Sequence, residues 1–484
     1  MPRLLTAGLL VFLVALVGFE LSINGVWETD HAISFVQLDY ALWHDHSFAL
    51  TSATRVPPWS VDDFVYGGQN YSALAPGTAF LALPFTGLGF TLAGGYTAYG
   101  NVLLLSEAFV ALTGALAAYV LYKLASLYFR RSTSIFLGFA FAFSTILWPF
   151  STYFFQSDPS ALFVLLTAYF GVKAARAEGG GANLALLSGL SAGAAFTVDS
   201  VNGVLLTIMV PFLLLMKRRS GGSLRAAGTY LLGSLPGFAA IGYYDYSIFG
   251  NPLVGAEQNY LHATSMFGSF TTSPVFGLTL DTVSFERGLL IFAPVLILGV
   301  FGYIDTLRQW RAKPEMILFL AIFLGILIPY SMWYEPDGGL GYGPRFLVAA
   351  VPFLLLPAGY IVEEARGWRR GLVYGIYAVG AVMNGLAAVV TAIPVSTGFS
   401  DSPFASVILP EFLRGDLDTS WGAGSAHASL LGALLILTLG VVIPIVAVEW
   451  ARRPEGEGRG PGGSLPDKIK TERPLIKTSR QSES

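Results

Sequence analysis

The chain has 484 residues, of which 54% are hydrophobic and only 12% are charged, and it contains no cysteine. The charged fraction is about half that of a soluble domain, so lipid must serve as the solvent for much of the surface. The lack of cysteine excludes a disulfide framework, a thiolate metal site and a cysteine nucleophile.

The first apolar run, Leu4 to Phe19, follows Arg3 and has no small-residue cleavage site before Glu20. It predicts a retained signal anchor whose N-terminus lies in the cytoplasm. Residues 22–75, rich in Asp, Trp, Tyr and His, then form a long external loop. Further apolar runs of spanning character follow, at 77–96, 98–129, 132–149, 159–175, 183–199, 201–216, 228–247, 288–304, 315–333, 346–362, 372–394 and 426–449.

The distribution of positive charge limits how many of these thirteen runs cross the membrane. If every run crossed, Arg130, Arg131 and the Lys217 cluster would lie outside, against the positive-inside rule. The run at 77–96 contains Pro84 and several glycines, which favours an interfacial helix over a straight span. Twelve spans remain, with both termini cytoplasmic. Of the 28 Lys and Arg residues, 24 then lie inside, and four lie outside: Arg55, Arg287, Arg345 and Arg414.

The predicted fold class is therefore an all-α, polytopic integral membrane protein with about 12 transmembrane helices plus external juxtamembrane helices. Residues 1–450 form the transmembrane domain, and 22–97 are its first external loop with the juxtamembrane helices. Residues 451–484, rich in Gly, Pro, Lys and Glu, are predicted to be a disordered cytoplasmic tail. No internal repeat is convincing, which weakens a transporter interpretation.

Acidic side chains gather on the predicted external face, most densely just after the first span. Glu28 and Asp30 would suit a general base or ligands for a hard divalent cation, although solvated loop charge is an equal alternative. Their place at a span end favours a cavity. Asp39 and Asp45 instead fit the polar side of an interfacial helix.

Two further acids stand at the outer ends of predicted spans. Asp158, before Pro159, suits either a second site acid or the N-cap of a helix. Asp199 is expected to cap the next helix in the same way.

Arg345 is one of the four external cations and precedes a predicted helix. An arginine fork together with helix N-terminal amides suits a phosphate group. The alternative is a salt bridge to Glu335 or Asp337. Arg55 and Arg287 are further phosphate candidates.

Several segments together resemble the GT-C superfamily of polyprenyl-phosphate-sugar-dependent glycosyltransferases, in the branch of protein O-mannosyltransferases and aminoarabinose transferases (glycosyltransferase family 39-like). The similarity covers most of residues 1–360. The segments that carry it are Thr29-Asp30, the Tyr-Ser and Pro-Gly pattern within 68–77, Phe249-Gly250-Asn251-Pro252, Gly343-Pro344-Arg345 and Pro352-Phe353-Leu354.

The resemblance implies roles for individual residues. Asp30 would be the base, Asp158 the second acid, and Arg345 the ligand of the donor phosphate. We also expect Glu28, His31, Tyr71 and Glu257 to contact the substrates. The sequence requires no cofactor; if a metal binds, Mg²⁺ or Mn²⁺ on Glu28, Asp30 and Asp158 is the expectation. Two positions depart from the family pattern: His31 stands where an acid often follows, and no basic residue lies near Asp199.

The implied reaction moves a hexose, mannose above all, from a polyprenyl (dolichyl) phosphate to a hydroxyl of a glycan, lipid or protein. It would proceed with inversion at the extracytoplasmic face of the cell membrane. Membrane lipid is the other expected partner, and nucleic acid is not expected. A lipid-linked-sugar transporter or flippase is the main alternative, and a non-catalytic membrane scaffold is weaker. An oligosaccharyltransferase-like enzyme is the nearest variant, although that group usually adds a large soluble C-terminal domain.

Overall fold

The computed structural model describes residues 2–25, 29–50, 60–92, 99–178, 181–219, 224–256, 260, 268–308, 314–336, 338–339, 341–394, 402–421 and 427–452. Helices dominate these residues, and one two-stranded hairpin, β1 with β2, is the sheet found among them. The predicted tail lies outside the described residues apart from its first two positions. The all-α fold class predicted from the sequence is confirmed.

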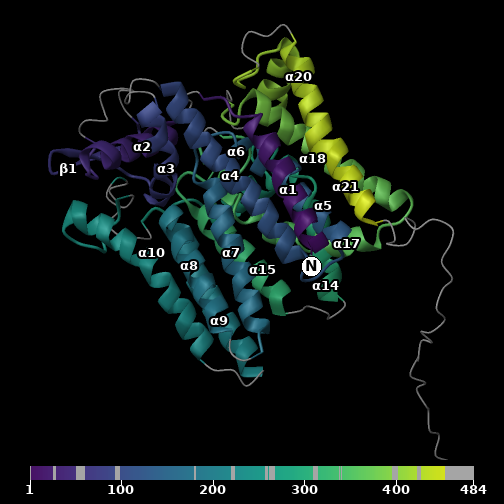
Figure 1. Cartoon of the computed structure of the whole chain (residues 1–484), viewed down its shortest axis with the longest axis horizontal. Helices are drawn as coiled ribbons and strands as arrows, with labels where there is room; N and C mark the ends of the chain where they lie inside the picture. Colours follow the sequence, from purple (N-terminus) through teal and green to yellow (C-terminus); the bar gives the residue numbers. More distant parts are fainter. Residues whose placement is uncertain are drawn as a thin grey trace, which may run out of the picture.

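The first half of the chain forms a bundle in which the longest helices run side by side (Figure 1). Helix α1 packs on α4 and α5, α7 packs between α4 and α8, and α8 lies along α10. The bounds of these elements are α1 Pro2–Glu20, α4 Tyr99–Ala125, α5 Arg131–Phe143, α6 Leu147–Phe150, α7 Ser157–Arg176, α8 Ala182–Val198, η3 Ser200–Gly203, α9 Val204–Arg219 and α10 Arg225–Phe249.

The second half of the chain adds helices along the other side of this bundle. Helix α15 packs on α9, α14 on α17, and α21 on α5. The bounds are α12 Pro274–Val283, α13 Leu289–Phe292, α14 Leu296–Arg308, α15 Pro314–Met332, η4 Arg345–Leu347, α16 Val351–Leu355, α17 Ala358–Glu364, α18 Trp368–Val390, η5 Phe404–Ile408, α19 Leu409–Arg414, α20 Ala428–Leu435, η6 Ile436–Val442 and α21 Ile443–Arg452.

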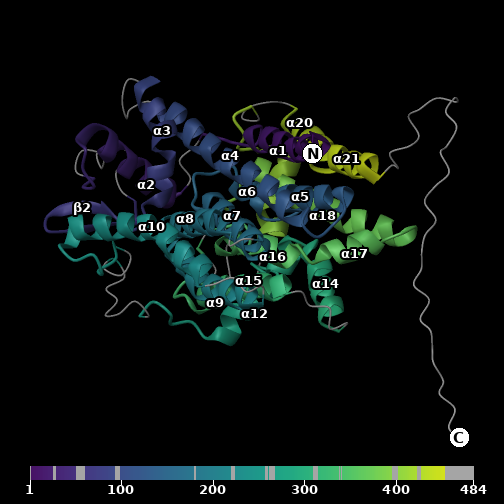
Figure 2. The same ribbon diagram turned by 60° about the horizontal axis from the view of Figure 1, so that its bottom comes forward.

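The first loop forms a small second core at one end of the molecule, beside the end of α10 (Figures 1 and 2). It contains α2 (Asp30–Tyr40), the π-turn η1 (Ala41–Asp45), β1 (Asp63–Tyr66), β2 (Gln69–Ser72) and α3 (Gly77–Leu92). The strands meet through Gly67 and Gly68, whose φ angles of 57° and 81° suit a two-residue hairpin turn. The ring of Phe64 on β1 stacks on Phe249 at the end of α10. The hairpin is thereby fixed to the helix bundle.

The predicted interfacial helix after the first span is present as α2. Its apolar side is buried as expected, with Phe35 and Leu38 at 1% and 0% exposure. Asp39, which we expected on the polar side, is wholly buried, because α3 covers that face of α2. The sequence pattern identified the helix but not the neighbour that covers it.

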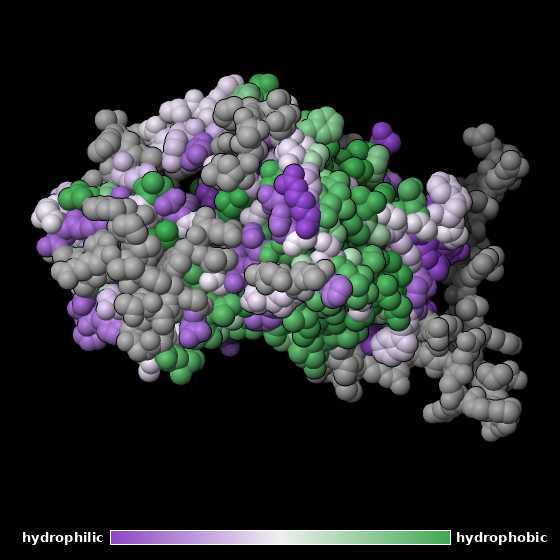
Figure 3. Space-filling model, turned by 90° about the horizontal axis from the view of Figure 1, so that it is seen from above, coloured by the Kyte–Doolittle hydropathy of each residue, from purple (hydrophilic) through white to green (hydrophobic). Residues whose placement is uncertain are grey.

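The thirteen predicted apolar runs all contain helix. Within the described part of the chain, four helices have the length and composition to cross a membrane: Asn101–Ala125, Pro314–Met332, Trp368–Val390 and Ala428–Arg452. Five shorter apolar helices accompany them, including Gly77–Leu92, the run assigned to the interface. The count of twelve spans stays a prediction. Seen from above, hydrophobic side chains form a broad area over one half of the molecule, and hydrophilic ones gather on the other (Figure 3).

Candidate functional site

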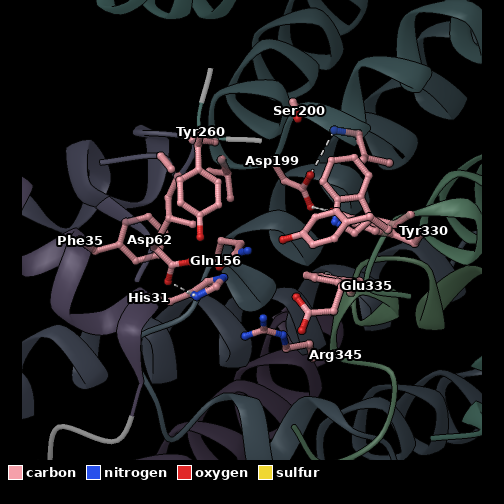
Figure 4. Close-up of a pocket in the computed structure, with 18 residues that line it drawn as sticks. His31, Phe35, Asp62, Gln156, Asp199, Ser200, Tyr260, Tyr330, Glu335 and Arg345 are labelled. Atoms are coloured by element: carbon pink, nitrogen blue, oxygen red, sulfur yellow. Dashed lines mark hydrogen bonds and ion pairs between the residues drawn. The ribbon is translucent and has the colours of Figure 1, made fainter. Parts of the chain in front are cut away.

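A cavity of about 110 Å³ lies where the first loop meets the ends of the bundle helices (Figure 4). Its wall contains one histidine and one arginine from different segments, together with carboxylates and aromatic rings. Residues from the whole span of 31 to 346 contribute, and they are His31, Phe35, Asp62, Ala73, Leu74, Ala75, Gln156, Val198, Asp199, Ser200, Val201, Tyr260, Tyr330, Trp333, Tyr334, Glu335, Arg345 and Phe346. A concave, partly aromatic cavity with converging polar groups is the usual form of a small-molecule site.

His31 and Asp62 form a close pair on one wall. The His31 Nδ1 lies 2.7 Å from Asp62 Oδ2, and both side chains are only 15% exposed. Thr29 caps α2 by accepting a hydrogen bond from the Ala32 amide, which fixes the first turn that carries His31. Burial disfavours ionisation of Asp62, but His31 and then Arg345 outweigh it, so its pKa is lowered. Asp62 is therefore a carboxylate.

Arg345 provides the positive charge of the cavity. Its guanidinium lies 5.0 Å from the ring centres of both Phe155 and Phe346. Burial lowers the pKa of Arg345, while nearby Asp62 and Glu335 oppose that shift. Its Nε has no hydrogen-bond partner among the described residues. A cation held this way has donor capacity left for a ligand.

The loop before Arg345 curls because its glycines accept left-handed backbone conformations. Gly338 and Gly343 have φ angles of 68° and 71°. A methyl group at Gly338 would stand 3.1 Å from Arg345 Cγ, so the loop runs against the stem of that side chain. The helix expected after Arg345 begins as a three-residue 3₁₀ turn, in which the Arg345 amide donates to Gly343. The predicted helix N-terminus is thus only a short turn at Arg345, and the guanidinium is the cationic group that faces the cavity.

Asp199 forms the opposite wall with Tyr330. The Tyr330 hydroxyl donates to Asp199 Oδ2 over 2.5 Å, and the Val201 amide donates to Oδ1 over 3.1 Å. The second bond confirms the predicted capping role, although the capped element is the short turn η3 that leads into α9. Burial raises the pKa of Asp199, and these two donors only partly oppose the rise. The Tyr330 ring also stacks on Phe346.

Of the residues predicted from sequence, His31 and Arg345 line the cavity together. Asp30 stands one residue before His31, but its side chain is not on the cavity wall; its Oδ1 accepts a hydrogen bond from the Val61 amide. Tyr71 lies on β2 opposite Phe64, within the small core. Glu28, Glu257 and Arg55 lie outside the described residues.

Asp158 is turned away from the cavity. Its Oδ2 accepts a hydrogen bond of 2.5 Å from Ser151, and an alanine methyl at Gly114 of α4 would stand 2.2 Å from the same oxygen. Helix α7 begins at Ser157 with Gln156 at the cap position, so the expected capping role of Asp158 is also wrong. The structure thus does not bring Asp158 to Arg345.

Arg287, a further phosphate candidate from the sequence, contacts the loop before Arg345. Arg287 is 2% exposed and donates to the Gly339 carbonyl, so it supports the glycine loop that carries Arg345. Among the described residues, no group of three His, Asp or Glu side chains is arranged to hold a metal ion.

Sequence reasoning missed Asp62, Gln156 and Tyr330 as wall residues. Asp62 carries the one usable signal, because it belongs to an acidic pair with Asp63 at the start of the apolar segment that becomes β1. Glu335 was considered only as a partner for Arg345, and it lies beside that residue on the cavity wall.

The architecture is a polytopic bundle of apolar helices, with a juxtamembrane subdomain and a charged cavity at the helix ends. Comparisons with known proteins relate this architecture to membrane glycosyltransferases. Residues 88–243 match the family model described as dolichyl-phosphate-mannose-protein mannosyltransferase. A search of the curated proteins found no match.

Two solved structures align with most of the chain. ArnT from Cupriavidus metallidurans bound to undecaprenyl phosphate aligns with a TM-score of 0.50 at 14% identity, over 93% of this chain and 75% of ArnT. The archaeal oligosaccharyltransferase AglB from Archaeoglobus fulgidus aligns with a TM-score of 0.49 at 11% identity, over 79% of this chain and 56% of AglB. Residues 88–243 are thus similar to that mannosyltransferase family, and the chain shares its fold with ArnT.

Proposed function

We propose that the chain transfers a sugar from a polyprenyl-phosphate donor to an acceptor hydroxyl, with inversion at the anomeric carbon, on the extracytoplasmic face of the membrane. The observation that carries this proposal is the half-buried Arg345 guanidinium on a wall that also holds Asp62, Glu335 and Asp199. A cation suits the donor phosphate, and carboxylates suit sugar hydroxyls and the acceptor proton.

The protein's part in this reaction is mainly to position and stabilise charge. Phosphate is already a good leaving group, so Arg345 need only hold it as its negative charge grows. The predicted base for the acceptor proton is Asp30, the residue that precedes His31 of the cavity wall. The polyprenyl chain lies against apolar helix surfaces, so it is not exposed to water.

The donor and acceptor follow from the comparisons only as classes. The family model names dolichyl-phosphate mannose and protein, and ArnT was solved with undecaprenyl phosphate. We propose a polyprenyl-phosphate hexose, with mannose first, and a hydroxyl on a protein, glycan or lipid. Both termini would then lie in the cytoplasm. If the reaction uses a divalent cation, Glu28 and Asp30 stay its predicted ligands, and EDTA in the assay tests that need.

The experiment uses the purified full chain in liposomes with a panel of radiolabelled polyprenyl-phosphate hexoses and hydroxyl acceptors. Release of polyprenyl phosphate together with labelled acceptor supports the proposal. If no donor is consumed and the intact lipid-linked sugar instead moves between the leaflets, the chain is a flippase and the proposal fails.

A further inference from the structure

The start of α5, the start of α18 and the end of α21 meet on the side of the molecule away from the first loop (Figures 1 and 2). In the predicted topology this side is cytoplasmic. The ring of Phe136 on α5 lies against that of Tyr374 on α18, with the two centres 6.3 Å apart. The Arg452 guanidinium of α21 lies 5.9 Å from the centre of the same tyrosine ring. Three helices thus bring their basic ends together.

Arginines outnumber acids where these helices meet. The acids of the segments involved are Glu363, Glu364 and Glu449. Glu449 is shared, because its carboxylate lies 3.5 Å from Arg370 and 3.9 Å from Arg452. The excess of positive charge comes from six arginines at or just before the ends of the three helices, and they are Arg130, Arg131, Arg366, Arg369, Arg370 and Arg452.

Arg131 is the member of this group that the rest of the protein engages least. Its guanidinium lies 4.9 Å from the ring centre of Trp450. Its Nε has no hydrogen-bond partner among the described residues, and none of the ion pairs within them involves Arg131. The Nε of Arg370 is likewise without a partner there. Since a guanidinium has five N–H donors, both side chains keep donors for an anion.

The same helices also expose apolar side chains along their length. On α21, Trp450 and Val446 are 56% and 60% exposed, and on α18, Leu372 and Val379 are 53% and 54% exposed. Among the four long apolar helices of the described residues, the one that ends with α21 is the least buried, at 33% of its most apolar stretch. A free phosphate ion would use only the cations. A phospholipid would place its phosphate at the arginines and its acyl chains along the apolar surface.

We propose that the arginine cluster formed by Arg131, Arg370 and Arg452 binds the phosphate of an anionic membrane phospholipid such as phosphatidylglycerol. The planar donors of arginine can contact two phosphate oxygens at once. Trp368 and Trp450 suit the level of the headgroups, where an indole ring meets both apolar chains and polar groups. The bound lipid links α21 to α5 and so secures the long helix that the protein itself covers least. This site is separate from the proposed sugar transfer and is tested without a sugar donor.

Titration of the full chain in detergent with phospholipid, followed by native mass spectrometry, tests the site. Wild type should bind its first phosphatidylglycerol at least about tenfold more tightly than phosphatidylcholine, because each arginine near an anionic lipid contributes about fivefold. Arg131→Gln should lower the association constant for phosphatidylglycerol about fivefold, and adding Arg370→Gln should lower it further. Arg131→Lys keeps the charge and should lose much less. Arg414→Gln is the matched control, because Arg414 is an exposed arginine outside the cluster.

Thermal melting without lipid establishes that each variant is folded. Should Arg370→Gln be unstable, Arg131→Gln decides alone, since it breaks no ion pair of the described residues. Phosphatidylglycerol should raise the melting temperature of wild type more than phosphatidylcholine does, and Arg131→Gln should remove most of that difference. The site is overturned if both lipids bind wild type equally, or if excess inorganic phosphate displaces the lipid completely, which would make a free anion the ligand. It is also overturned if Arg131→Gln and the double variant bind phosphatidylglycerol as the control does, which would place binding elsewhere, for instance in the C-terminal tail.

Discussion

Replacing Arg345 by methionine separates binding of the donor phosphate from stability of the fold. Methionine keeps the apolar stem that runs against Gly338 and removes the guanidinium that lies over Phe155. Each charge-assisted hydrogen bond to phosphate contributes about 1.5–3 kcal/mol, and a two-pronged contact about 3–5 kcal/mol. At about 1.4 kcal/mol per tenfold, kcat/KM should fall by about 10² to 10⁴-fold.

The same substitution should leave the protein about as stable as before. No carboxylate among the described residues lies within 4.0 Å of the Arg345 guanidinium, and burial already disfavours its charge. Removing a buried cation without a close partner recovers its desolvation cost. We expect an unfolding free energy within about 1 kcal/mol of the wild type, since sites built for ligands are rarely optimised for stability.

The assay is donor consumption in liposomes, with thermal melting of each variant in detergent. Arg345→Lys should recover only part of the activity, because an ammonium cannot make the two-pronged contact. Arg414→Met is the matched control, since Arg414 is an exposed external arginine. An Arg345→Met protein that retains its melting temperature and more than about a fifth of wild-type kcat/KM would refute the phosphate assignment.

Three further predictions test packing, pH dependence and topology. A methyl group at Gly189 would stand 2.0 Å from a carbonyl oxygen of α10, so Gly189→Ala should lower stability by about 1–3 kcal/mol in thermal melts. Gly228→Ala is the control, because Gly228 has open space around it and the substitution should be neutral or stabilising. Burial raises the pKa of Asp63 to about 7, so the folded state binds this proton more tightly than the unfolded state does. Stability should therefore fall as pH rises from about 4 to about 7. Asp63→Asn should remove that pH dependence from melting curves. In this cysteine-free chain, Val65→Cys should react with an impermeant maleimide from outside the cell, and Arg369→Cys only after permeabilisation.

The sequence predicted the helices well because each apolar run has few ways to satisfy its backbone in lipid. It also predicted α2 from the spacing of Phe35 and Leu38, and the capping by Asp199 from its place between two apolar runs. In these cases the local sequence pattern determines the structure, and contacts with neighbouring elements contribute little.

The site itself was predicted only in part, because side-chain direction depends on contacts between distant segments. Asp158 points at Ser151 since α4 offers the close approach of a glycine there, and no local pattern reveals that contact. Asp62 reaches the cavity because the hairpin folds back on α2 through Asp30 and Ser60. Arg345 was found because it is one of only four predicted external cations among many acids.

The cavity draws its polar groups from the ends of helices, and this placement has a physical reason. His31 lies in the first turn of α2, Asp199 follows the end of α8, Tyr330 lies near the end of α15, and Arg345 precedes α16. Charged groups at such positions avoid the cost of lying in hydrocarbon. A lipid phosphate lies at the headgroup level, so its lipid chain can stay among apolar helices while its sugar reaches these side chains. In the proposed reaction the donor therefore need not leave the bilayer.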